Sequence, residues 1–433
     1  MSHVPIQVVE VRAWGRSVGA VSPGPARGYS FEYQPAWSRE GAALAPFLTP
    51  QQPVGRIHTY QPTSTDTWRG LPPFVADSLP DDFGNALVDA WMSRHGVAVD
   101  HITPLDRLGY LGVRGMGALE FVPDTGPNGP SPTAIDLSDL IVAARAAVHG
   151  SLLDDNEAQR SLQEIIDVGT SAGGARAKAI LNINAETGEI RSGHLPPLSG
   201  YQPWLLKFDG VGVDRQLGSS QVYGRIEYAY SHMARAAGIH MAESQLLQEN
   251  GRAHFISRRF DRDSHGNKVH MQTLCALYGV DYRLRNTNDY SQLMMCIREL
   301  GLGQEALVEG FRRAVFNVAT MNRDDHAKNF AFLLPHEGAW QLSPAYDVTF
   351  AYNPQGVWTA HHQMGINGTF DNITRADLLR FADEHGVQAG GAIISDVLDA
   401  VASWPEFARH AGLTSSSIDE VSRHFQHLAR RRP

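Results

Sequence analysis

The stretch MNRDDHAKNFAFLLPHEGAWQLSPAYDV, residues 321–348, places ionisable side chains directly against an apolar run. Two aspartates, a histidine, a lysine and an asparagine fall within Asp324–Asn329, and the apolar residues 330–334 follow at once. The residues from there to Tyr346 are typical of two short strands joined by a turn. Such a hairpin would bring Asn329 at its start close to Asp347 at its end.

The loop before this hairpin has the spacing of a phosphoryl-transfer site. Kinases use a loop of the form H-R-D-x-x-x-x-N, in which the aspartate accepts the substrate hydroxyl proton and the asparagine binds magnesium. Here Arg323 and Asp324 match the Arg-Asp pair, and Asn329 follows Asp324 at the same spacing. The pattern predicts Asp324 as the general base, with Asn329 and Asp347 as oxygen ligands of Mg²⁺. A polar turn that ends the preceding helix would have the same composition.

A second charged pair lies further upstream. Lys207 stands inside the apolar segment PWLLKF, where a lysine is costly to bury unless it is paired. Kinases hold the α- and β-phosphates of ATP with such a strand lysine, backed by a helix glutamate. Glu227, on the next predicted helix, is the candidate partner. The alternative is an edge-strand lysine that extends to solvent and a surface glutamate.

A glycine-rich segment precedes that lysine. Gly173 and Gly174, in TSAGGARAK, allow backbone N–H groups to turn toward an anion, although a plain Gly-Gly turn is the commoner reading of such a pair. The order along the chain is glycine loop, strand lysine, helix glutamate, catalytic loop and metal aspartate. This is the order of a protein-kinase site.

Composition limits the other classes of protein. Hydrophobic residues make up 42% of the 433 residues and charged residues 19%, which is typical of a folded globular chain. The net charge of −9 argues against a protein that coats nucleic acid. Cys275 and Cys296 lie in apolar segments and are predicted to be reduced core thiols, which suits a cytoplasmic protein. No segment is typical of a signal peptide or a membrane anchor.

The pattern of elements predicts an α+β protein with a protein-kinase-like two-lobe fold. Residues 1–125 are predicted to form a β-rich subdomain, which ends at the Pro- and Gly-rich segment VPDTGPNGPSP. Residues 126–262 are predicted to be a unit like the kinase N-lobe, with the glycine loop and the phosphate lysine. Residues 263–433 are predicted to be a mostly helical lobe that carries the catalytic loop and the metal aspartate.

At these residues the chain resembles the HipA-type toxin kinases of bacterial toxin–antitoxin pairs. The similarity runs through SAGGARAK, SRRFDR, DDHAKNF and LSPAYDV, and in the N-terminal third through GRSVGAV and PPFVADSLPDDFGNALVD. The sequence departs from many relatives at Asp325, where they carry a smaller residue. That departure bears on substrate choice and loop dynamics.

The resemblance implies a serine/threonine protein kinase with ATP and Mg²⁺ as cofactors. It assigns Asp324 and Lys207 to catalysis, and Asn329 and Asp347 to the metal. The kinase pattern adds Glu227 to the catalytic residues as the partner of Lys207. The resemblance also implies nucleotide contacts and self-phosphorylation of Ser171; the nucleotide-binding residues are Gly173, Gly174, Ala175, Lys207, Arg258, Phe260, His326, Tyr346 and Asp347. The implied partners are a small helix-turn-helix antitoxin like HipB, operator DNA reached through that antitoxin, and a translation-related substrate such as an aminoacyl-tRNA synthetase.

Two other classes of function remain open from the residues. A metal-dependent phosphohydrolase could use Asp324, Asp325 and His326 with the pair His361–His362, because histidines favour zinc or transition metals. A non-catalytic co-repressor subunit is suggested by the basic end VSRHFQHLARRRP. Cations at a helix C-terminus more commonly complement the helix dipole.

Overall fold

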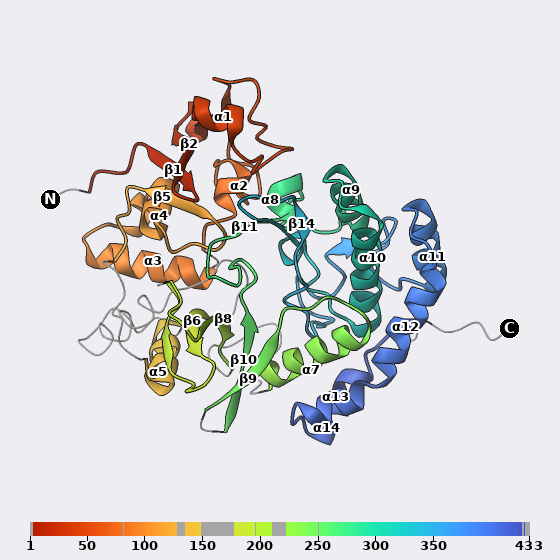
Figure 1. Cartoon of the computed structure of the whole chain (residues 1–433). Helices are drawn as coiled ribbons and strands as arrows, with labels where there is room; N and C mark the ends of the chain where they lie inside the picture. Colours follow the sequence, from red (N-terminus) through yellow and green to blue (C-terminus); the bar gives the residue numbers. More distant parts are fainter. Residues whose placement is uncertain are drawn as a thin grey trace. The chain divides into compact units, whose positions relative to one another are not determined.

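The computed structural model describes residues 3–80, 82–127, 135–148, 177–194, 196–209, 222–249, 251–426 and 428. The chain divides into two compact units. The first contains residues 1–212, 256–272 and 333–339, and the second contains residues 213–255, 273–332 and 340–433. Figure 1 shows the elements of both.

The first unit begins with an antiparallel sheet of strand order β4-β3-β2-β1-β5. Its strands are β1 (Val9–Ala13), β2 (Arg16–Pro23), β3 (Tyr29–Tyr33), β4 (Ile57–Tyr60) and β5 (Leu119–Val122). Every second side chain of β1 is buried, which is the alternation expected of a strand with one face on a core. Val9 pairs with Val21 of β2, and the register shifts by a bulge at Val11/Arg12.

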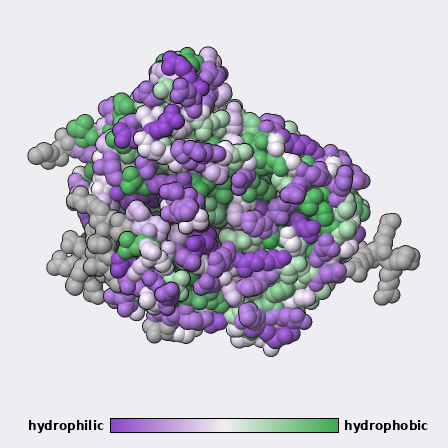
Figure 2. All heavy atoms as spheres, viewed as in Figure 1, coloured by the Kyte–Doolittle hydropathy of each residue, from purple (hydrophilic) through white to green (hydrophobic). Residues whose placement is uncertain are grey.

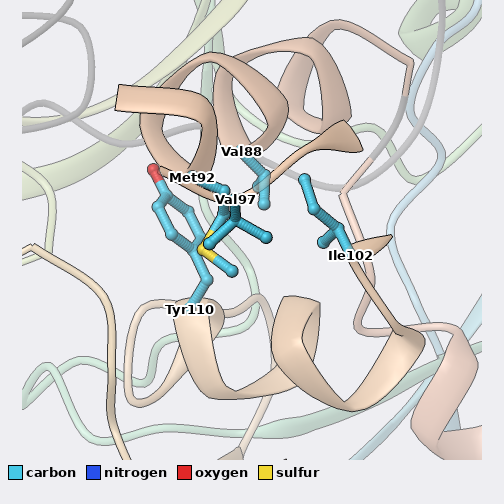
Figure 3. Close-up of a cluster of buried hydrophobic side chains, with 5 residues drawn as sticks. All are labelled: Val88, Met92, Val97, Ile102 and Tyr110. Atoms are coloured by element: carbon cyan, nitrogen blue, oxygen red, sulfur yellow. The ribbon is translucent and has the colours of Figure 1, made fainter. Parts of the chain in front are cut away.

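Short helices accompany this sheet in the first unit: α1 (Pro35–Glu40), α2 (Pro73–Ala76), α3 (Asp82–Arg94), α4 (Pro104–Leu111) and α5 (Leu137–Val148). Helix α4 starts with a capping box, because Thr103 and Asp106 each bond the other's backbone N–H. A buried apolar cluster lies around α3 and α4 (Figure 3), made of Val88, Met92, Val97, Ile102 and Tyr110. This cluster attaches the helices to one another.

Within the first unit, a buried ion cluster connects Gly117, which precedes β5, to residues 259–262, which follow β10 (Arg252–Arg258). Asp261 accepts hydrogen bonds from Arg259, Arg262 and the backbone N–H of Gly117, at 2.8–2.9 Å. Burial alone would raise the pKa of Asp261, but the charges of Arg259 and Arg262 hold that pKa well below its ordinary value. The sequence RRFDR showed no sign of this role.

The first unit also contains β6 (Lys178–Asn184), β7 (Ile190–Ser192) and β8 (Tyr201–Lys207). Strand β6 lies between β7 and β8, and both pairings are antiparallel. Lys178 is the register partner of Lys207. The apolar segment around Lys207 is therefore a strand, as predicted.

The second unit is mostly helical and is built around one long helix. Its helices are α7 (Tyr223–Ala236), α8 (Leu274–Tyr278), α9 (Tyr290–Glu299), α10 (Gly303–Thr320), α11 (Arg375–Glu384), α12 (Gly390–Ala402), α13 (Trp404–His410) and α14 (Ser415–Ser422). Helix α10 packs against α9 and α12 (Figure 1). Its residues from Arg313 to Thr320 are all buried, so the helix forms the core of this unit.

Short strands complete the chain: β9 (Ser244–Glu249), β11 (His270–Thr273), β12 (Asn288–Asp289), β13 (Ala331–Leu334), β14 (Gln341–Leu342) and β15 (Met364–Gly365). Strands β13 and β14 are neighbours in one sheet, and the N–H of Ser343 donates to the carbonyl of Ala331 over 2.9 Å. The predicted hairpin between Asn329 and Asp347 is confirmed. The predicted fold class, with a β-rich N-terminal region and a helical C-terminal part, is also confirmed.

Apolar side chains are gathered inside the two units, while hydrophilic residues predominate on the face shown in Figure 2. Cys275 and Cys296 are buried free thiols, as predicted. Burial raises the pKa of the Cys296 thiol well above its usual range, so this thiol is held in its protonated form. Within the described residues, no helix combines the length and the apolar character needed to cross a membrane.

Candidate active site

The candidate site begins where α10 ends. Met321 adopts a left-handed backbone (φ 57°), which reverses the chain after Thr320. Asn322 then donates to Asn317 twice, from its backbone N–H to the carbonyl over 3.0 Å and from its side chain to the Asn317 side chain over 2.9 Å. The helix end therefore fixes the position from which the catalytic loop starts.

Asp324, the predicted general base, is accessible to solvent. Its side chain is 48% exposed, and one carboxylate oxygen lies 3.6 Å from Nε2 of His326. The side-chain amide of Asn329 donates to the backbone carbonyl of Asp324 over 2.6 Å. This bond orients the side chain of Asn329, and the amide oxygen is its only atom that can bind a cation.

Asp347 lies at the far end of the hairpin in a left-handed backbone conformation (φ 54°), which is uncommon for non-glycine residues but which aspartate tolerates better than most. Hydrogen bonds hold the two residues that precede it, Ala345 and Tyr346, in place. The hydroxyl of Tyr346 donates to the carbonyl of Lys328 over 2.6 Å, and the N–H of Ala345 donates to the carbonyl of His240 over 2.7 Å. The Tyr346 bond joins the metal segment directly to the catalytic loop.

Asn329 and Asp347 line one small pocket of the second unit. The pocket is lined by Ile239, Arg313, Phe316, Asn317, Asn322, Asp325, Asn329, Phe330, Ala345, Tyr346, Asp347 and Val348. It has room for an ion or a water molecule rather than for a nucleotide. The amide oxygen of Asn329 and the carboxylate of Asp347 are hard oxygen donors, so the donor set fits Mg²⁺.

Asp325 is the residue whose role the sequence did not reveal. It is 1% exposed and accepts three hydrogen bonds, from the hydroxyl of Tyr290 over 2.9 Å, from Nδ1 of His362 over 2.8 Å and from the N–H of Gln363 over 2.7 Å. Tyr290 in turn accepts from Asn317 over 2.9 Å. Asp325 is therefore a buried anchor of the loop, while its neighbour Asp324 faces solvent.

The residues that a phosphohydrolase would have combined lie in two separate pairs with different exposure, Asp324 with His326 and Asp325 with His362. His362 is fully buried and bonded to Asp325, whereas the side chain of His361 is 54% exposed and lies 3.7 Å from Asp371. The described residues contain no group of three or more His, Cys, Asp or Glu side chains placed to hold one metal ion. Among the described residues, Asp324, Asp325, His326, His361 and His362 are therefore not gathered around one metal position.

A tyrosine from another loop borders the site. The ring of Tyr282 lies 5.4 Å from the ring of His326 and 5.2 Å from Nζ of Lys328. An aromatic face attracts a nearby ammonium group. Because Tyr282 is distant in sequence and stands in no recognisable motif, only the tertiary structure could associate it with the catalytic loop.

The other predicted site residues are divided between the two units. Lys207 is the buried last residue of β8 in the first unit, and Glu227 is buried on α7 in the second unit. Arg258 ends β10, and its guanidinium lies 5.7 Å from the ring of Trp204. Phe260 follows in the first unit. The pairing of Lys207 with Glu227 and the nucleotide contacts of Arg258 and Phe260 remain predictions.

The glycine loop lies outside the described residues. Ser171, Gly173, Gly174 and Ala175 all belong to that part of the chain. Their assigned roles in phosphate binding and self-phosphorylation therefore stay predictions. The structure brings together the predicted catalytic loop and the predicted metal segment, with the residues Asp324, His326, Asn329, Tyr346 and Asp347.

Comparison with known proteins agrees with the fold. Residues 9–122 match the HipA N-terminal domain, and residues 170–405 match the HipA-like C-terminal domain. In Sinorhizobium fredii, the protein named "Putative kinase Y4mE" is 24% identical over 374 residues, which are 80% of this chain and 78% of the relative. "Putative kinase Y4dM" from the same organism is 31% identical over 148 residues, which are 30% of this chain and 35% of that relative.

A solved structure shares the architecture. The HipA chain in the Shewanella oneidensis complex of HipA, HipB and operator DNA has a TM-score of 0.65 and 16% identity, and the match covers 96% of this chain and 94% of that one. This chain is thus a protein with a β-rich HipA N-terminal domain followed by a HipA-like C-terminal domain. The chain belongs to the HipA family.

Proposed function

We propose that the chain is an ATP- and Mg²⁺-dependent serine/threonine protein kinase and the toxin of a toxin–antitoxin pair. The observation that carries this proposal is the hydrogen bond from the Asn329 side chain to the backbone carbonyl of Asp324. This bond supports a site in which an exposed carboxylate and an oxygen ligand belong to one rigid loop. The names of both Sinorhizobium relatives support the same class of enzyme.

Asp324 orients the hydroxyl of the acceptor serine or threonine and accepts its proton as the phosphoryl group is transferred. The half-exposed carboxylate is open to an incoming protein substrate. Asn329 and Asp347 hold Mg²⁺, which when bound would neutralise the charge of the ATP phosphates. His326 and Tyr346 border the nucleotide, and Tyr346 keeps the metal segment in place through Lys328.

The remaining nucleotide contacts are assigned by sequence pattern. Lys207 binds the α- and β-phosphates and is oriented by Glu227. Gly173, Gly174 and Ala175 cover the phosphates with backbone N–H groups. Arg258 and Phe260 form the segment beside the adenine ring.

The proposed partners of this chain are inferred from the HipA complex of known structure. That HipA chain is in complex with HipB and operator DNA, which supports a small helix-turn-helix antitoxin as the partner of this chain. Operator DNA would be reached through the antitoxin, in keeping with the net charge of −9. The toxin would act in the cytoplasm on a translation-related protein, such as an aminoacyl-tRNA synthetase, and would phosphorylate itself on Ser171.

The decisive experiment is phosphoproteomics of cells that express either the wild type or Asp324→Asn. We expect phosphoserine or phosphothreonine sites on a translation-related protein that are present only with the wild type. In parallel, purified protein is incubated with labelled ATP. Label on protein supports a kinase, whereas release of free phosphate with no labelled protein would contradict the proposal and favour a hydrolase.

A further inference from the structure

The segment that follows the metal aspartate, residues 348–372, is attached to the catalytic loop through Arg323. The guanidinium of Arg323 donates to the backbone carbonyl of Ala360 and to the carboxylate of Asp371. Arg323 is 5% exposed and Asp371 is 36% exposed, so the ion pair is largely shielded from solvent on the arginine side. Arg323 immediately precedes the proposed base Asp324.

A second attachment lies two residues further along the same segment. Asp325 accepts hydrogen bonds from Nδ1 of His362 and from the N–H of Gln363. The two residues that flank Asp324 in sequence therefore both bind residues 360–363. Because these bonds surround Asp324 on either side, a shift of the segment would displace the base.

The start of the segment is also aligned with the loop. Ala351 forms a parallel bridge with Asn322, through bonds of 3.2 Å to Met321 and Arg323. The ring of Tyr352 lies 4.7 Å from the Arg323 guanidinium. Arg323 is thus the point at which the beginning, the middle and the end of residues 348–372 meet.

In many protein kinases the segment after the metal aspartate is ordered only when a phosphorylated residue pairs with an arginine. A carboxylate can make the same charge-assisted bond to a guanidinium without modification. We propose that Asp371 is a positioning residue that replaces this phosphate: through Arg323 it holds residues 348–372 against the catalytic loop, so the site is assembled without phosphorylation of the segment. The inference rests on the proposed kinase function.

The test compares Asp371→Asn and Asp371→Glu with the wild type and with the control Asp383→Asn, an exposed aspartate of α11. Asp371→Asn is expected to lower kcat by about ten- to hundredfold with a much smaller change in KM for ATP, because the base is misplaced while the nucleotide site is kept. Asp371→Glu retains the carboxylate and is expected to recover a large part of kcat. Wild-type kcat in Asp371→Asn would overturn the inference.

A readout that does not depend on catalysis separates this inference from the proposed function. Amide hydrogen exchange of residues 348–372 is expected to be faster in Asp371→Asn than in the wild type, and unchanged in Asp383→Asn. Unchanged exchange in Asp371→Asn would contradict the inference even if the wild type is an active kinase. Faster exchange in Asp371→Asn, together with a wild type that transfers no phosphate, would support the attachment of the segment and reject the proposed kinase function.

Phosphopeptide mapping of the active wild type completes the test. We expect no phosphate on the hydroxyl residues of the segment, which are Thr349, Tyr352, Thr359 and Thr369. A phosphate on one of these residues whose enzymatic removal abolishes phosphoryl transfer would show that the segment is activated by modification and would overturn the role of Asp371.

Discussion

The side chain of Asn329 donates a hydrogen bond to the backbone carbonyl of Asp324 across 2.6 Å. This bond closes the catalytic loop on itself. It ties the proposed magnesium ligand to the residue that carries the proposed base, so a change at one is transmitted to the other.

Asp324→Asn should abolish phosphoryl transfer and leave nucleotide binding nearly unchanged. The amide cannot accept the hydroxyl proton, and loss of a general base lowers rates by roughly 10²–10⁴-fold. ATP affinity is measured by calorimetry and transfer by labelled phosphate on protein. Glu420→Gln, an exposed position on α14, serves as the control. Wild-type turnover in Asp324→Asn would show that the base has been assigned wrongly.

Asn329→Ala and Asn329→Asp should differ in their requirement for Mg²⁺, although both should lower kcat. Alanine removes both the oxygen ligand and the bond to Asp324, so the Mg²⁺ concentration for half-maximal activity rises and kcat falls. Aspartate keeps an oxygen ligand but cannot donate to the Asp324 carbonyl, so magnesium binding is retained while kcat falls by about tenfold or more. Magnesium titrations of activity test this difference. Equal behaviour of the two variants would argue against the structural role of the bond.

Asp347→Asn should weaken both nucleotide binding in the presence of Mg²⁺ and phosphoryl transfer. Asparagine tolerates the left-handed backbone found at this position (φ 54°), so the substitution removes charge without adding backbone strain. Affinity for ATP is compared with and without magnesium. In the variant, magnesium is expected no longer to increase the affinity for ATP. If magnesium still increases this affinity, Asp347 is not a ligand of the metal.

Ser171 should become phosphorylated when the protein is incubated with ATP, and this should switch the kinase off. A phosphate in a loop whose N–H groups bind ATP phosphates would compete for the same donors or draw the loop toward nearby cations. Intact-mass analysis should show one added phosphate that is absent from both Ser171→Ala and Asp324→Ala. An active wild type with unmodified Ser171 would contradict this prediction.

The free energy of unfolding should decrease as the pH is lowered from 6.5 to 4, because of His270. This imidazole is buried beside the carbonyl of Leu44, and burial lowers its pKa to about 4, while an unfolded histidine keeps a value near 6.5. As the pH falls through this window, the unfolded chain binds a proton that the folded chain excludes. The free energy of unfolding should then decrease by up to about 3 kcal/mol.

The measurement is urea unfolding at pH 7.5 and pH 5.0. His270→Gln should reduce the loss of stability on acidification, whereas His265→Gln, at an exposed position, should not change it. If the wild type and His270→Gln lose stability equally between these pH values, the titration of His270 is not the cause.

The sequence by itself determined those features that depend on neighbouring residues. The hairpin follows from the apolar run after Asn329, and the relation of Asn329 to Asp324 spans only five positions, so local backbone geometry brings the two together. The alternation of β1 and the caps of α4 are local in the same sense. The class of fold and the family could be predicted for this reason.

Only the tertiary structure decided the role of Asp325. Its three partners lie 35, 37 and 38 positions away, and no sequence pattern connects them. Two adjacent aspartates look alike in sequence, yet one is buried in a hydrogen-bond network and the other is half exposed. The pairing of Arg323 with Asp371 spans 48 positions and was likewise hidden. Such contacts depend on how α9, α10 and residues 348–372 pack, because burial makes each polar group require a partner that packing alone can supply.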